Sequence, residues 1–117
     1  MKVAIRRVYD EPGDDEGVRV LVDRLWPRGL RKEALEYDLW EKEIAPTPAL
    51  RKWFGHDPKR WQAFREKYSE ELKTAEVQER LHTLVKQAGK RNITLLYGAR
   101  DPQHNHALIL AEVLKKL

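Results

Sequence analysis

Two short segments near the start of the chain alternate apolar and polar side chains. Residues Val3–Val8 and Val18–Leu25 repeat with a period of two and are rich in β-branched residues, which is typical of β-strands. The run Glu11–Gly17 between them is rich in Pro, Gly and Asp and predicts a turn. The second segment is apolar on one face and partly apolar on the other, as expected of a central strand.

The middle of the chain changes to a helical pattern. Thr47-Pro48 predicts a helix start, with Thr as the N-cap and Pro at the first helical position, and this helix should end near Gly55. Asp57-Pro58 repeats that signal, and the helix after it carries apolar side chains three or four residues apart at Trp61, Phe64, Tyr68 and Leu72. A further helix ends at Gly89 and has its apolar face at Val77, Leu81, Leu84, Val85 and Ala88.

Three more segments complete the expected order of elements. A short third strand is expected over Leu39–Ala45, Ile93–Tyr97 reads as a buried parallel strand, and His104–Leu117 forms the closing helix. Long helical crossovers between strands favour a parallel or mixed sheet covered by helices. We therefore predict one α/β domain over residues 1–117, a compact sandwich with a small sheet of about four strands, for which a Rossmann-like fold is one form.

Composition narrows the function classes. The 117-residue chain has no cysteine, which excludes disulfides and thiolate chemistry. Its net charge of +4 is modest and the signs are mixed, whereas a dedicated DNA-binding protein usually has a denser basic stripe. An anionic partner, either a small phosphate or a nucleic acid, stays open beside a merely solvated surface. The opening residues lack an apolar signal region and no apolar run could span a bilayer, so we expect a cytoplasmic location and no membrane partner.

Candidate chemistry follows from where the predicted strands end. Ligands of open α/β sheets bind beyond the C-terminal ends of the strands. The segments at these positions are Asp23–Gly29, Ala45–Pro48 and Tyr97–Asn105. If the strands are parallel, these segments converge on one edge, which would hold Arg24, Arg28 and Arg100 beside Asp23 and Asp101.

Three segments carry a resemblance to a known family. They read VLVDRLWPRGL, IAPTPALRKWFGHDPKRWQAF and TLLYGARDPQHNHA, and together they resemble the signature of the DUF488 family, YeaO-like branch. The resemblance covers nearly the whole chain and implies the fold and the candidate site, but no established reaction. Carried over to this chain, the family's motif residues are Asp23, Arg24, Trp26, Pro27, Arg28, Gly29, Pro46, Arg51, Trp53, Phe54, His56, Asp57, Trp61, Tyr68, Tyr97, Asp101 and Asn105.

The first motif has a functional and a structural interpretation. Arg24 and Arg28 flank Trp26-Pro27 and could close on a phosphate or carboxylate as a guanidinium clamp. Alternatively, a carboxylate holds Arg24 in a structural ion pair. Trp26 could stack on a planar ring, or it could plug the core.

The second motif mixes basic, aromatic and titratable side chains. His56 lies beside Asp57 and could act as a general acid or base. The simpler alternative is that Asp57 caps the next helix and His56 merely precedes it. Arg51 is a further candidate for contact with a ligand, while the aromatic residues are most simply core.

The third motif follows the buried strand. Tyr97, Arg100 and Asn105 are candidates for ligand binding, and Asp101 could serve as a base, a nucleophile or a turn cap. Asn105 could equally cap the closing helix. His104 and His106 are two apart, so on a helix they diverge, and no third ligand follows at a suitable spacing. We therefore predict no metal site and no cofactor.

Three hypotheses of function remain. The first is binding of an anionic small molecule, nucleotide or nucleic acid at the C-terminal edge of the sheet. The second is an enzyme acting on a phosphorylated or nucleoside-like substrate, with transfer or hydrolysis at an N-glycosidic or similar bond, in which Asp23 or Asp101 reacts and His56 assists. The third is a protein-interaction module that uses residues 51–61. The sequence leaves the oligomeric state open.

Overall fold

A four-stranded parallel sheet organises the molecule, and the computed structural model describes residues 2–117. The strands are β1 (Val3–Arg7), β2 (Val18–Leu21), β3 (Leu39–Trp40) and β4 (Ile93–Tyr97), and their order across the sheet is β1-β4-β2-β3. Every neighbouring pair is parallel. The predicted α/β class with a small sheet is therefore confirmed, and the sheet is parallel rather than mixed.

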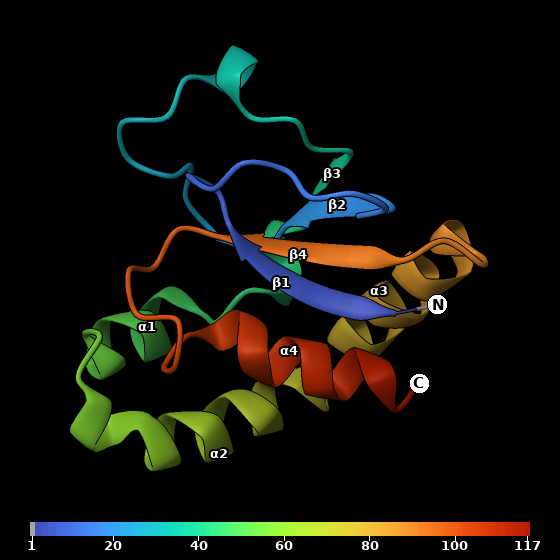
Figure 1. Cartoon of the computed structure of the whole chain (residues 1–117). Coiled ribbons are helices and arrows are strands. Elements are labelled where there is room, and N and C mark those ends of the chain that lie inside the picture. Colours follow the sequence, from blue (N-terminus) through green and yellow to red (C-terminus); the bar gives the residue numbers. More distant parts are fainter. Residues whose placement is uncertain (1) are drawn as a thin grey trace.

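Four helices lie on one side of this sheet (Figure 1). They are α1 (Pro48–Phe54), α2 (Trp61–Leu72), α3 (Ala75–Ala88) and α4 (His106–Lys115). Their apolar faces pack on the strand residues that point towards them, such as Val20 and Leu95, and form the main core. All four predicted helices are present, and the N-cap at Thr47 and the residue Gly55, which ends α1 in a left-handed conformation, are confirmed. The helix predicted from Asp57-Pro58 begins at Trp61, after a 3₁₀ turn at Pro58–Arg60.

The opposite face of the sheet is covered by irregular chain instead of helices. The loop between β2 and β3 crosses this face (Figure 1), and Trp26, Leu30 and Leu35 from it pack on Leu21 and Leu96. The loop contains a short 3₁₀ turn, Lys32–Ala34. This loop buries only part of the second face under apolar side chains.

Ionic contacts cover another part of that face. Glu16 forms ion pairs with Arg6 and with Arg19, whose Nε lies 2.9 Å from Glu16 Oε1. Thr94, on the central strand β4, donates a hydrogen bond to the carbonyl oxygen of Glu16 at 2.8 Å. Arg19 is buried, so its charge depends on this carboxylate for compensation.

Several element boundaries differ from those predicted. The third strand was expected to reach Ala45, but it ends at Trp40 because the chain turns into a 3₁₀ turn at Lys42–Ile44. The second strand ends at Leu21 rather than Leu25, although the N–H of Val22 still donates to Leu96 O at 3.0 Å. The last helix begins at His106, two residues later than predicted, because Asn105 is its N-cap.

The predicted central position of the second strand is correct. β2 lies between β4 and β3, and all four of its residues are buried.

Among residues 2–117, no helix combines the length and the apolar character that crossing a membrane requires.

Candidate functional site

A cleft of about 990 Å³ opens at the C-terminal edge of the sheet. All four strands run in the same direction, so the loops after β2 and β4 meet there, beside α1 (Figure 1). Nine of the ten residues singled out from the sequence line this cleft, namely Asp23, Arg24, Trp26, Arg28, Arg51, His56, Arg100, Asp101 and Asn105. The tenth, Tyr97, belongs to the helix-side core, and burial raises the pKa of its hydroxyl.

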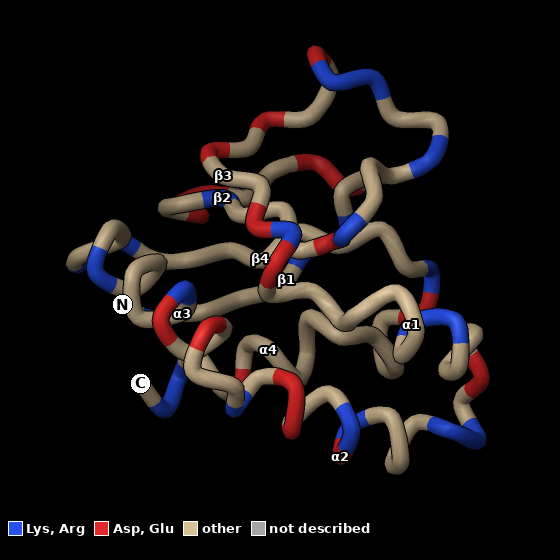
Figure 2. Tube along the Cα trace, turned by 180° about the vertical axis from the view of Figure 1, so that it is seen from behind, with Lys and Arg blue, Asp and Glu red and all other residues tan. Residues whose placement is uncertain are grey.

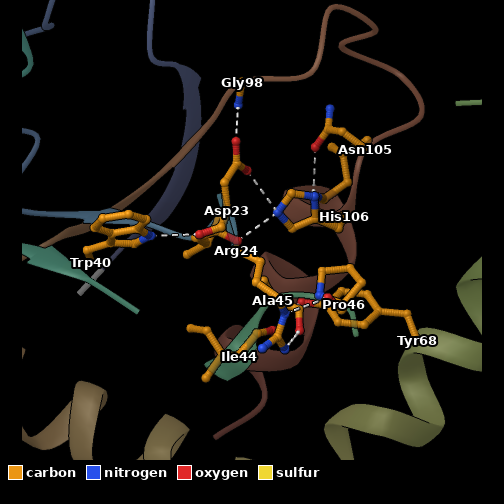
Figure 3. Close-up of polar contacts among 12 residues, drawn as sticks. Asp23, Arg24, Trp40, Ile44, Ala45, Pro46, Tyr68, Gly98, Asn105 and His106 are labelled. Carbon is orange, nitrogen blue, oxygen red and sulfur yellow. Dashed lines mark hydrogen bonds and ion pairs between the residues drawn. The ribbon is translucent and has the colours of Figure 1, made fainter. Parts of the chain in front are cut away.

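Asp23 holds the loops after β2 and β4 together. Its Oδ2 atom accepts a hydrogen bond from the N–H of Gly98 at 2.9 Å, and His106 Nε2 lies 3.3 Å from its Oδ1 atom (Figure 3). A Cβ atom at position 98 would come within 2.9 Å of the same Oδ2 atom. Gly98 therefore allows the backbone to approach the Asp23 carboxylate closely, which a side chain at this position would prevent.

Arg24 anchors the loop after β2 to the chain in front of α1. Its guanidinium donates to the carbonyl oxygens of Ala45 and Pro46, both at 3.1 Å, and lies 3.7 Å from Glu43 (Figure 3). Tyr68 donates to the neighbouring carbonyl of Ile44 at 2.6 Å from the buried side. These contacts match the structural interpretation of Arg24, since most of its donors already have acceptors.

Trp26 is packed rather than free. Its ring meets the rings of Tyr37 and Trp40 edge to face, with centroids 5.7 and 5.4 Å away. Its indole N–H donates to Leu30 O within the same loop. Trp26 thus fixes the shape of the loop and borders the cleft at the same time.

Asp101 is engaged by its own turn. Its Oδ1 atom accepts from the N–H of Gln103 at 2.9 Å, and its Oδ2 atom lies 2.8 Å from His104 Nδ1. The hydrogen bond from Gln103, and next the one from His104, hold the pKa of Asp101 below its ordinary value. Asn105 is buried and caps α4, since its side chain accepts from Leu108 N and donates to Asp101 O.

His56 stands in a left-handed backbone conformation with φ of 57°. Its ring is exposed and its centroid lies 6.3 Å from that of Phe54. The neighbouring Asp57 accepts from Lys59 N at 3.0 Å, which is ordinary capping of the 3₁₀ turn Pro58–Arg60. The structural interpretation of Asp57 is therefore correct, and His56 forms no hydrogen bond within residues 2–117.

Three arginines at the cleft stay free of internal partners. Arg28 follows β2, Arg51 lies on α1 and Arg100 follows β4, and all three are exposed. None of their guanidinium groups forms an ion pair or hydrogen bond with another residue of the described chain, 2–117. Figure 2 shows basic segments on both loops and on α1 at this end of the sheet.

Four further polar side chains line the cleft, and the sequence analysis assigned none of them to an anion site. Arg7 and Tyr9 end β1 and the turn after it, where the Arg7 guanidinium lies 4.7 Å from the centre of the Tyr9 ring. Applying the strand-end rule to the first strand as well would have found both. His104 and His106 also line the cleft, although the sequence suggested only a role as metal ligands for them. Among residues 2–117, no group of three or more acidic or histidine side chains is placed to hold a metal ion.

Comparison with known proteins shows which family the chain belongs to. A family profile described as "Inactive DUF488-N3 subclade" matches residues 2–117. The chain is 44% identical over 117 residues to the uncharacterized protein YeaO of Escherichia coli (strain K12), with both chains covered completely. It is 38% identical over 113 residues to the uncharacterized protein Rv3073c of Mycobacterium tuberculosis (strain ATCC 25618 / H37Rv), covering 97% of this chain and 93% of that protein.

The chain therefore belongs to the DUF488 family, in its YeaO-like branch. The three motifs that suggested the resemblance lie at the C-terminal edge of the sheet and in the helices beside it. No solved structure matches the chain significantly.

Proposed function

We propose that this protein binds a small organic oxyanion, a phosphate or carboxylate compound such as a nucleotide, in the cleft at the C-terminal edge of the sheet. The observation that carries the proposal is the set of lining cations. Five arginines line the cleft and no lysine does, although the chain contains eleven lysines. The planar guanidinium fork matches carboxylate and phosphate oxygens in pairs, which an ammonium group does not.

The balance of charge supports the same class of ligand. Two carboxylates, Asp23 and Asp101, line the cleft together with the five arginines, and both already accept hydrogen bonds from backbone N–H groups. Arg28, Arg51 and Arg100 keep their donors for a ligand. The volume of about 990 Å³ is at the upper end of the range for small-molecule sites, which suits a ligand of nucleotide size.

Binding has more support than catalysis. The matching family profile is described as an inactive subclade. The carboxylates that were candidates for acid, base or nucleophile hold the fold together, Asp23 through Gly98 and Asp101 through Gln103. We therefore propose no reaction, and a location of the protein in the cytoplasm remains a prediction.

The protein-interaction hypothesis finds little support in segment 51–61. Phe54 is buried and Trp61 packs on Phe64, so Trp53 is the segment's one large exposed aromatic side chain. The cationic groups of Arg60 and Lys67 lie 5.2 and 5.3 Å from the centre of its ring. A single ring already engaged by two cations does not amount to an apolar docking patch.

A thermal-shift screen tests the proposal. The panel contains inorganic phosphate, ribose 5-phosphate, nucleoside monophosphates, short carboxylic acids and short single-stranded DNA, each at low and moderate salt. A ligand present at one hundred times its Kd adds about 2.7 kcal/mol to the free energy of unfolding, which raises the melting temperature by several degrees.

Matched variants place the site. Arg28→Gln, Arg51→Gln and Arg100→Gln should each weaken binding about ten- to a hundredfold, because a hydrogen bond to a charged group contributes roughly 1.5–3 kcal/mol. Arg80→Gln removes an exposed charge from α3, away from the cleft, and should leave affinity unchanged. Equal effects of all four substitutions would show attraction by net charge alone, and no shift with any compound would refute the proposal.

A further inference from the structure

The ring of His104 is held by a carboxylate at the wall of the cleft. Asp101 Oδ2 lies 2.8 Å from His104 Nδ1, and the other carboxylate oxygen accepts from Gln103 N at 2.9 Å. The Trp61 ring meets the imidazole edge to face, with centroids 5.4 Å apart. Both the position and the orientation of this histidine are therefore set before any ligand arrives.

This arrangement decides where the neutral imidazole carries its proton. The pKa of Asp101 lies below its ordinary value of 3.8, first because Gln103 N and then because His104 donates to it, so Asp101 is charged at neutral pH. A charged carboxylate only accepts hydrogen bonds. The His104 Nδ1 atom must then donate, so the Nε2 atom of the neutral ring has a lone pair. Nε2 forms no hydrogen bond with another residue of the described part of the chain, and the side chain is 33% exposed where it lines the cleft.

We propose that the Nε2 lone pair of His104 makes the cleft selective for oxyanions whose organic body carries a hydroxyl or amine group. The inference rests on the proposed anion binding and names the subclass of ligand. The arginines of the cleft can only donate, so they recognise the phosphate or carboxylate end. A donor elsewhere on the ligand finds its acceptor at His104 Nε2, and a purely alkyl body leaves that nitrogen unpaired.

The other histidine of the same motif does not offer this contact through its Nε2 atom. His106 Nε2 lies 2.9 Å from the carbonyl oxygen of Val22, which can only accept, so Nε2 of His106 carries the proton and is used inside the fold. Sugar phosphates and the ribose of nucleotides carry hydroxyl donors of the required kind. His104 should therefore favour phosphates or carboxylates that carry a hydroxyl or amine group over those whose body is purely alkyl.

Calorimetric titration with two phosphates of similar length tests the inference. At pH 8.5, ribose 5-phosphate should bind wild-type protein about tenfold more tightly than pentyl phosphate. In His104→Phe the affinity for ribose 5-phosphate should fall, so that the ratio approaches one. Equal affinity of the two phosphates for the wild type, or an equal loss of both in the variant, would overturn selection by His104 while leaving anion binding intact.

A spectroscopic measurement keeps the test independent of whether that variant folds. Nitrogen chemical shifts of the imidazole rings in the wild type should show His104 protonated at Nδ1, and ribose 5-phosphate should shift its Nε2 resonance. In Asp101→Asn the amide NH₂ would face Nδ1 and move the ring proton to Nε2. Protonation at Nε2 in the wild type would overturn the inference, and failure of both phosphates to bind would refute the anion site and His104 selection together.

Discussion

At the scale of single residues, the charged side chains of the cleft divide into those used by the fold and those left free. Arg24 donates to two carbonyl oxygens, and Asp23 and Asp101 accept from backbone N–H groups. Arg28 and Arg100 lie in the same loops and have no such partner within residues 2–117. The free arginines define the anion site, and the engaged side chains give it a fixed shape.

Away from the cleft, Glu16 compensates the charge of the buried Arg19. Glu16→Gln should lower the free energy of unfolding by about 3 kcal/mol, because Arg19 would stay buried without a compensating charge. Urea denaturation measures the change. Glu70→Gln is the matched control, since Glu70 pairs with Lys73 on an exposed helix face at 3.1 Å, and it should cost less than about 0.5 kcal/mol. Similar costs at both positions would contradict the role given to Glu16.

Asp101 should give stability a defined dependence on pH. Its pKa in the folded protein lies below its ordinary value of 3.8, so its charge contributes stability above that value, and the contribution is lost as pH falls through the folded pKa. The difference in unfolding free energy between wild type and Asp101→Asn should shrink as the pH falls below about 4. Urea denaturation across this range measures it, and a difference that grows on acidification would contradict the assignment.

The strand-end rule located the arginines from the sequence but could not rank them. Nothing in the residues themselves separates Arg24 from Arg28, because the distinction depends on Ala45 and Pro46, which the fold brings close to one and not to the other. The hydrogen bond between Asp23 and Gly98 could not be predicted from the sequence either. The two residues are distant in the chain and meet only because β2 and β4 are neighbours.

At the scale of elements, local signals predicted the helices well and the short strand poorly. Pro48 and Gly55 mark the ends of α1 by backbone geometry alone, and the structure has both marks where they were expected. β3 has only two residues, Leu39 and Trp40, and pairs with β2 through tertiary contacts, so no period in the sequence could set its end.

The cap of α1 has a measurable effect, and this helix carries Arg51. The Thr47 hydroxyl accepts from Leu50 N at 3.3 Å and donates to Glu71 at 2.7 Å. Thr47→Ala should therefore destabilise the protein by about 1–2 kcal/mol in urea denaturation.

Thr74→Ala is the matched control for this prediction. Thr74 is the N-cap of α3 but its side chain makes no capping hydrogen bond. This substitution should cost less than half as much as Thr47→Ala. The reverse order would contradict the described cap.

At the scale of the whole molecule, the parallel sheet creates the site. Because the four strands share one direction, five arginines meet at a single edge, carried by the end of β1, the loops after β2 and β4, and the helix α1. An antiparallel β2 would have sent Arg24 and Arg28 to the opposite edge. The order of long helical crossovers favoured a parallel or mixed sheet, but the strand order β1-β4-β2-β3 and the thin cover of the second face depend on packing that no local pattern encodes.

The measurement that tests the anion site most directly is a titration of the nitrogen-labelled protein with ribose 5-phosphate, followed through its backbone amide resonances. The proposed site predicts that the largest shifts fall in residues 23–28, 51–56 and 98–106, and that they saturate together with a single Kd. Shifts confined to α3 or spread evenly over the surface would contradict the proposed cleft, as would spectra that stay unchanged at millimolar ligand.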